Sequence, residues 1–142
     1  MKAAKKGWLT EALRRAAWAP VTVFLLHVAI SLGGGYGAIP TLDIPMHLLG
    51  GAAIGYFLWS SYSVAATAGV LGKPSKILGV ILVFALICSS TVFWEFGEFL
   101  ADKYLGTHSQ LDLDDTLFDM LLGILGGTAF LTTMIGRAAL EV

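Results

Sequence analysis

The chain has 142 residues, of which 56% are hydrophobic and only 13% are charged. A soluble domain carries about 25% charged residues, so this composition, with a mean hydropathy of +0.78, favours a membrane protein. Cys88 is the single cysteine, which excludes a disulfide framework within the chain and a zinc site built from cysteines. The formal net charge is -1, and no nucleic-acid partner is expected.

Four stretches are long and apolar enough to cross a bilayer: residues 17–33, 45–71, 77–100 and 117–135. Lipid cannot satisfy the backbone of an open sheet, and the stretches lack the alternation of barrel strands, so we expect helices. The predicted fold is all-α, a polytopic transmembrane four-helix bundle in which residues 1–142 form one domain. Residues 1–16 are expected to form a short amphipathic segment on the cytoplasmic leaflet. The basic start of the chain also resembles a secretory signal, but no clear cleavage site follows, and we expect this first helix to be retained.

The basic residues predict the orientation, because lysine and arginine mark the cytoplasmic side of a membrane. With four crossings, all of them except Lys103 fall on the side of the two termini. We therefore expect both termini in the cytoplasm (N-in/C-in) of a bacterium, with the chain in its inner (plasma) membrane. Among the acidic residues only Glu11 and Glu141 lie on that side. Because acidic residues contribute little to topology, their segregation indicates an outward-facing polar site.

Three pairs of ionisable residues lie near the outer ends of three predicted helices: Asp43 and His47, Glu95 and Glu98, and Asp115 and Asp119. Residues three or four apart share one face of a helix. Glu95 lies about 28 Å along its helix from Lys76, close to the outer boundary of a ~30 Å hydrocarbon core. A charged side chain costs about +2.5 to +3.5 kcal/mol at the centre of a membrane helix, and less near the interface. Six such groups at one depth therefore indicate a shared use.

Carboxylates gathered at one depth need counter-charge, and the predicted membrane helices contain no lysine or arginine to provide it. Either some of them keep protons, or cations bind; bundle cores that hold two metals use inward Glu and His at helical spacings. We therefore expect a divalent metal ion, with Mn, Mg, Fe, Zn and Ca as the candidates. Its candidate ligands are Asp43, His47, Glu95, Glu98, Asp115 and Asp119. Glu98 and Asp115 are also the candidate catalytic bases.

A structural interpretation remains open beside the metal site. Asp43 and Asp115 stand where each could cap the start of a helix, and the other acids could simply face water at the interface. Several further polar residues are expected to be solvated or structural: Asp102, Asp112, Asp114 and His108 in the outer loop, and His27 within the first helix. Whether His27, Asp112 or Asp114 joins the site stays open.

Two small-residue patterns predict close contacts between helices. They run from Gly51 to Gly55 and from Gly123 to Gly127. Small residues at a spacing of four let membrane helices approach each other closely. Within a four-helix bundle we expect these patterns to serve packing within one chain rather than dimerisation.

A family resemblance extends over about residues 42–127. It is carried by Asp43-Ile-Pro-Met-His47, Glu95-x-x-Glu98, Gly106-Thr-His-Ser-Gln-Leu-Asp112 and Asp115-Thr116-x-x-Asp119-Met120. These segments resemble the YjdF-like family of small bacterial inner-membrane proteins and, more distantly, VanZ-like proteins. The resemblance implies a small multi-helix membrane bundle and no established reaction. YjdF-like proteins are usually longer and have additional spans. Relatives in the VanZ-like group are associated with glycopeptide resistance.

Three functions fit these features. The first is a metal-dependent hydrolase or transferase that acts on lipid-linked substrates at the outer leaflet. The second is a non-catalytic metal-binding or ion-handling membrane protein, and the third is an accessory structural subunit. The sequence does not predict the substrate, the identity of the metal or the oligomeric state.

Overall fold

The computed structural model describes residues 2–140, and the side chains of residues 7–135 within them. This part of the chain contains helices and no strand. The helices are α1 (Lys2–Ala16), α2 (Trp18–Leu32), α3 (Gly35–Ala38), the 3-10 turn η1 (Pro40–Leu42), α4 (Asp43–Thr67), α5 (Lys76–Leu105) and α6 (Leu113–Leu140). The all-α prediction is confirmed for the described residues.

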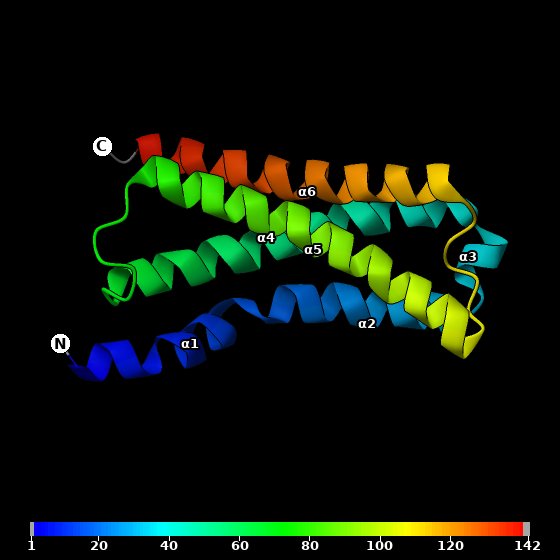
Figure 1. The fold of residues 1–142 in the computed structure, drawn as a ribbon, viewed down its shortest axis with the longest axis horizontal. Helices are drawn as coiled ribbons and strands as arrows, with labels where there is room; N and C mark the ends of the chain where they lie inside the picture. Colours follow the sequence, from blue (N-terminus) through cyan, green and yellow to red (C-terminus); the bar gives the residue numbers. More distant parts are fainter. Residues whose placement is uncertain (1, 141–142) are drawn as a thin grey trace.

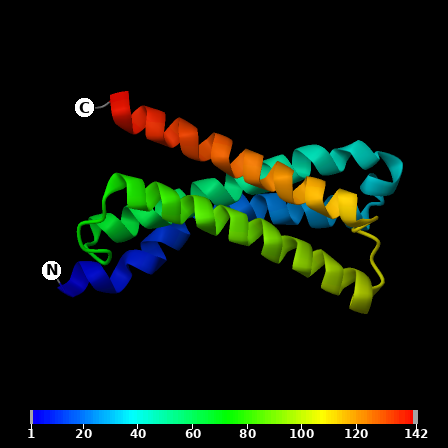
Figure 2. The same ribbon diagram turned by 45° about the horizontal axis from the view of Figure 1, so that its top comes forward.

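The long helices run side by side along one axis (Figures 1 and 2). Helix α4 is central, because it packs against α1, α2, α5 and α6, and most extensively against α6. Both ends of the chain lie at one end of the bundle, and α3 and the α5–α6 loop lie at the other (Figure 1). The helix order therefore brings the start of α4, the end of α5 and the start of α6 together at the end away from the termini.

Glycines allow the close contact between α4 and α6. A Cβ atom added at Gly51 would overlap the carbonyl oxygen of Gly123, and one at Gly55 would lie 3.0 Å from the carbonyl oxygen of Gly127. At Gly126 it would overlap the carbonyl oxygen of Leu48. The two backbones thus touch where side chains would otherwise keep them apart. The predicted packing of the two small-residue patterns within one chain is confirmed.

Two helices meet the length and composition required of a membrane span: α5, and residues Leu113–Ile135 of α6. A third span results if Gly7–Ala16 and Trp18–Leu32 count as one, bent by 49°. Helix α4 is not among them, because serines, glycines and the polar residues of its first turns dilute its apolar content. Two to three of the four predicted spans are therefore confirmed. Many large apolar side chains are exposed, as expected for helices in contact with lipid.

Residues 2–16 form helix α1, which packs against the bundle. Ala12 and Ala16 are buried, and α1 contacts α4. The hydroxyl of Tyr56 in α4 donates to the carbonyl oxygen of Arg15 at 3.2 Å, and its ring lies 5.7 Å from that of Trp18. The break between α1 and α2 is therefore fixed against α4.

The ends of the helices differ from the predicted spans by a few residues. Helix α4 ends at Thr67 rather than near residue 71, and Gly69 and Gly72 follow it with a φ of 70°. Ser75 caps α5 by accepting the N–H of Leu78 at 3.2 Å. Helix α5 continues five residues beyond the predicted end at residue 100, because no residue breaks it before Gly106, which has a φ of 69°.

Candidate functional site

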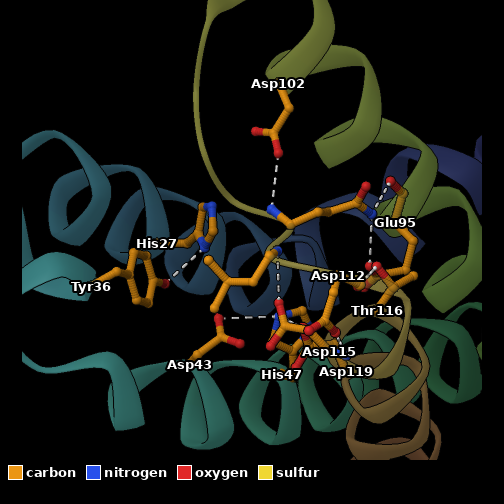
Figure 3. Close-up of polar contacts among 12 residues, drawn as sticks. His27, Tyr36, Asp43, His47, Glu95, Asp102, Asp112, Asp115, Thr116 and Asp119 are labelled. Carbon is orange, nitrogen blue, oxygen red and sulfur yellow. Dashed lines mark hydrogen bonds and ion pairs between the residues drawn. The ribbon is translucent and has the colours of Figure 1, made fainter.

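Most of the predicted ionisable residues lie close together (Figure 3). They come from the parts of α4, α5 and α6 that lie toward the end of the bundle away from the termini. His47 comes from the second turn of α4, Glu95 and Glu98 from the second half of α5, and Asp119 from the second turn of α6. All four are buried, with exposed fractions of 9% for His47, 5% for Glu95, 8% for Glu98 and 5% for Asp119. Such burial is unusual for charged residues without a partner.

One half of the site joins α4 to α6. His47 Nε2 lies 3.3 Å from Asp43 Oδ1 and 3.7 Å from Asp119 Oδ2, so the imidazole lies between the two carboxylates (Figure 3). The capping role considered for Asp43 is wrong, since Leu42 is the N-cap of α4 and no side chain caps this helix. The four-residue spacing instead directs the Asp43 carboxylate along the helix toward His47.

The other half of the site joins α4 to α5. His47, Glu95 and Glu98 each offer one ligand atom within 4.8 Å of the others, and so do Asp43, His47 and Asp119. Metal–ligand bonds measure about 2.0–2.6 Å, so opposite ligands of one ion are at most about 5 Å apart. Each group of three fits this limit. His47 belongs to both groups and connects them.

The site has an excess of negative groups. Four carboxylic acids surround one histidine, and no lysine or arginine among residues 7–135 forms an ion pair with them. Lys103 lies over the rings of Phe99 and Tyr104, 5.7 and 5.6 Å from their centroids. Protons or cations must therefore balance the carboxylates.

The α5–α6 loop covers Glu95, and Gln110 is the loop residue that makes the contact. The side-chain amide of Gln110 donates to Glu95 Oε2 and to the Glu95 carbonyl oxygen, both at 3.1 Å. Asp102 holds this loop in place, because its carboxylate accepts the N–H groups of Ser109 and Gln110 at 2.9 Å and the hydroxyl of Thr107. Asp102 is therefore a loop anchor rather than the solvated acid that we expected.

Asp115 belongs to neither group of three. Its carboxylate accepts the N–H of Leu111 at 3.2 Å. The residue that caps α6 is Asp112, whose carboxylate accepts the N–H of Asp115 at 2.9 Å. The prediction that Asp115 caps this helix is therefore wrong by three residues. Asp114 and His108 are exposed, as expected.

His27 and Tyr36 are additional residues near the site that sequence reasoning did not assign to it. The Tyr36 hydroxyl and His27 Nδ1 form a hydrogen bond of 2.8 Å (Figure 3). The ring of Trp94 meets the His27 ring edge to face at 5.1 Å between centroids. Burial raises the pKa of Tyr36 to about 12, and the charges of Asp43 and Glu98 add to the rise. The hydroxyl therefore keeps its proton at neutral pH.

A cavity of about 430 Å³ adjoins the site. His27, His47, Glu95 and Asp119 line its polar end. Its remaining wall is mainly apolar and comes from α2, α4 and α5, with Gly123 of α6. A ligand in this cavity would thus meet the carboxylates at one end and hydrocarbon along the rest of its length.

Comparison with known proteins places the chain among membrane proteins. The sequence profile of a family described as "Predicted membrane protein (DUF2238)" matches residues 8–139. A protein of Thermotoga maritima described as "Uncharacterized protein" is 32% identical over 111 residues, which are 74% of this chain and 53% of that protein. The chain thus spans about half the length of the curated relative it matches. No solved structure matches the chain. The likenesses to YjdF-like and VanZ-like proteins stay predictions.

Proposed function

The chain belongs to this family of predicted membrane proteins, and we propose that its buried histidine and carboxylates bind a divalent metal ion near one face of the bilayer. One observation carries the proposal. Two groups of three potential ligands share His47, and within each group the ligand atoms lie within 4.8 Å of one another. Glu95, Glu98 and Asp119 complete these groups from two other helices. Inward Glu and His side chains of this kind form the metal sites of helical bundles.

The charge balance supports a cation over acids that merely face water. Solvated acids would be exposed, whereas Glu95, Glu98 and Asp119 are buried. Buried carboxylates without counter-charge are strongly unfavourable. A divalent ion would supply that charge, with Asp43 adding a half-buried fourth carboxylate.

The chemistry of the ligands is compatible with each of the five candidate metals. The site offers several carboxylates and one imidazole, and Cys88 lies elsewhere in α5. Oxygen-rich sites suit Mg, Mn and Ca, and a mixed set with one imidazole also suits Fe or Zn.

We further propose that the chain crosses a bacterial inner membrane four times, with both termini inside and the site facing outward. In support, helix α1 and the α4–α5 connection lie on the side of the bundle opposite α3 and the α5–α6 loop (Figure 1). Helix α1 carries Arg14 and Arg15 in its last turn, Lys73 lies in the connection, and Lys76 begins α5. The site would then lie just below the outer lipid headgroups.

The reaction that suits this site best is a metal-dependent hydrolysis or group transfer on a lipid-linked substrate. A bound metal polarises ester or phosphoryl oxygens and lowers the pKa of water. Glu98, buried within the second group of three, is the candidate base that takes up the proton. Asp115 is a less direct candidate, because its carboxylate faces the backbone of the loop.

One observation favours a second function, which is metal binding without catalysis. No lysine or arginine with a described side chain pairs with the site, so only the metal could hold a phosphate group. Transport across the membrane is disfavoured, because the acids lie toward one end of α4, α5 and α6, whereas transporters place such groups near the midplane. A purely structural subunit is the third possibility, and it predicts that the acids can be replaced without loss of function.

Elemental analysis of the purified protein tests the metal site. We expect one or two divalent ions per chain. In Glu98→Gln and Asp119→Asn the metal affinity should fall by about 10–100-fold or more, since replacing residues that only contact the ligands already costs that much. Asp114→Asn is the matched control, because it makes the same change at an exposed position of α6. Wild-type protein that holds no metal and is not stabilised by added Mn, Zn or Mg would refute the proposal.

A further inference from the structure

The cavity beside the site lies between α2 and α5, two helices whose backbones hardly approach each other. Each of them packs instead against α4. Near the site they meet through aromatic side chains, with Trp94 of α5 edge to face with Phe24 at 6.2 Å and with His27 at 5.1 Å between centroids. Beyond this contact, toward the middle of the bundle, α2 and α5 do not pack against each other and instead form two walls of the cavity.

The cavity extends from the carboxylates toward the middle of the bundle. Ile54 lies seven residues beyond His47 in α4, and Ile87 lies eight residues before Glu95 in α5. At 1.5 Å per residue, both positions are about 10–12 Å from the site along the helix axis. The cavity thus runs from a polar end inward, in the same direction as a membrane lipid, whose headgroup lies at the interface and whose chains extend inward.

The walls favour a hydrocarbon chain over water. Phe24, Ile54, Ile87 and Phe93 are among the lining residues, and waters in a cavity need two to four polar partners each. At roughly 30 Å³ for a water-sized group, the volume of about 430 Å³ has room for about fourteen such groups. That is the size of one acyl or prenyl segment. The medium around these helices is itself lipid, so the occupant is available at high concentration.

We propose that this cavity holds one hydrocarbon chain of an anionic membrane lipid that enters between α2 and α5, with its phosphate headgroup at the end formed by His47, Glu95 and Asp119. The inference rests on the proposed metal site. Carboxylates repel a phosphate, and no described lysine or arginine offsets that repulsion. A divalent ion held by His47 and the carboxylates would offset that repulsion, so we expect lipid binding to depend on the metal.

Gly50 offers a way to fill the cavity without disturbing the bundle. It lines the cavity, and a Cβ atom added there meets nothing within 4 Å. Gly97 is the matched control, since it is also a glycine within a long helix whose Cβ would meet nothing, but it is exposed and does not line the cavity. Ser90 and Ser89 form a second matched pair, because both hydroxyls bond a carbonyl oxygen four residues back and only Ser90 lines the cavity.

The test is native mass spectrometry of the purified protein in detergent, titrated with phosphatidylglycerol in the presence of Zn²⁺ or Mg²⁺. We expect one lipid per metal-loaded chain, a loss of more than fivefold in lipid affinity in Gly50→Leu, and no loss in Gly97→Leu. EDTA should weaken lipid binding to the wild type by a similar factor. Glycerol phosphate, which has the headgroup chemistry without the chains, should not compete at lipid concentration.

The same spectra separate failure of this inference from failure of the proposed function. Metal-loaded wild type without lipid, or equal lipid binding by the wild type and Gly50→Leu, overturns the lipid site and leaves the metal site intact. Lipid binding that EDTA does not change overturns the proposed dependence of lipid binding on the metal. A chain that binds neither metal nor lipid overturns both proposals. If Gly50→Leu does not fold, Ser90→Leu replaces it, with Ser89→Leu as its control and the same expected loss.

Discussion

The contact between α4 and α6 predicts that one methyl group will disturb both the bundle and the site. In Gly126→Ala the new Cβ would overlap the carbonyl oxygen of Leu48, which is backbone and cannot rotate away. Non-bonded carbon and oxygen atoms need about 3.5 Å, so α4 and α6 must separate by on the order of 1 Å. Leu48 is next to His47 in α4, and Gly126 lies two turns beyond Asp119 in α6. The separation therefore reaches the candidate ligands.

The magnitude follows from two opposing effects. Overpacking costs about 1–3 kcal/mol, and a backbone clash belongs at the upper end of that range. Replacing glycine by alanine within a helix gains up to about 1 kcal/mol. We expect Gly126→Ala to lose about 2 kcal/mol and Gly97→Ala, where the Cβ meets nothing, to gain about 1 kcal/mol. Gly55→Ala should be close to neutral, because its Cβ would lie 3.0 Å from the carbonyl oxygen of Gly127 and needs a smaller shift.

Unfolding in detergent, followed by circular dichroism, measures the stability, and isothermal titration measures the metal affinity. Metal–ligand distances tolerate only about ±0.2 Å, so a displacement near 1 Å between His47 and Asp119 should weaken metal binding in Gly126→Ala by at least tenfold. Gly97→Ala should bind metal as the wild type does. Equal stability and equal metal affinity of Gly126→Ala and Gly97→Ala would refute the claim that this contact sets the geometry of the site.

Two further outcomes are expected. Asp102→Asn should weaken the anchor of the loop at residues 106–112 and cost about 1–2 kcal/mol, measured as faster proteolysis within the loop; Asp114→Asn, at an exposed position, should leave proteolysis unchanged. The pKa of Tyr36 is raised from 10.0 to about 12. Between these pH values the folded protein keeps the hydroxyl proton and the unfolded chain releases it. Stability should therefore fall as the pH rises from about 10 to 12, and fall less in Tyr36→Phe; identical pH profiles of the two proteins would contradict this assignment.

The gathering of the ionisable residues could be predicted because the sequence position of a residue in a membrane helix fixes its depth in the bilayer and the helix face on which it lies. Glu95 and Glu98 share a helix face through their spacing, and His47 and Asp119 each lie one turn inside the start of a helix. When helices run nearly parallel or antiparallel, residues at the same depth on neighbouring helices can lie side by side. Two sequence-level quantities, spacing and depth, were therefore enough to bring four of the residues together.

The roles of the loop residues depended on geometry that periodicity does not describe. Asp112, Asp114 and Asp115 are all acceptable N-caps by residue type, and the path of the loop decides that Asp112 is the cap. Asp102 bonds residues of the loop seven and eight positions further on, a distance that no helical repeat predicts. Tyr36 reaches His27 only because the chain turns back through the short helix α3 after the left-handed Gly34.

The shared end of the two termini has a practical consequence for measuring sidedness. Helices α5 and α6 are each about 42–45 Å long at 1.5 Å per residue. Both ends of the chain lie at the end of these helices opposite α3 and the α5–α6 loop (Figure 1). A fluorescent or enzymatic reporter fused to either terminus would lie on the order of 30 Å from the carboxylates, which is the thickness of a hydrocarbon core. Such fusions can therefore establish which compartment the termini occupy while leaving the ligand end of the molecule untouched.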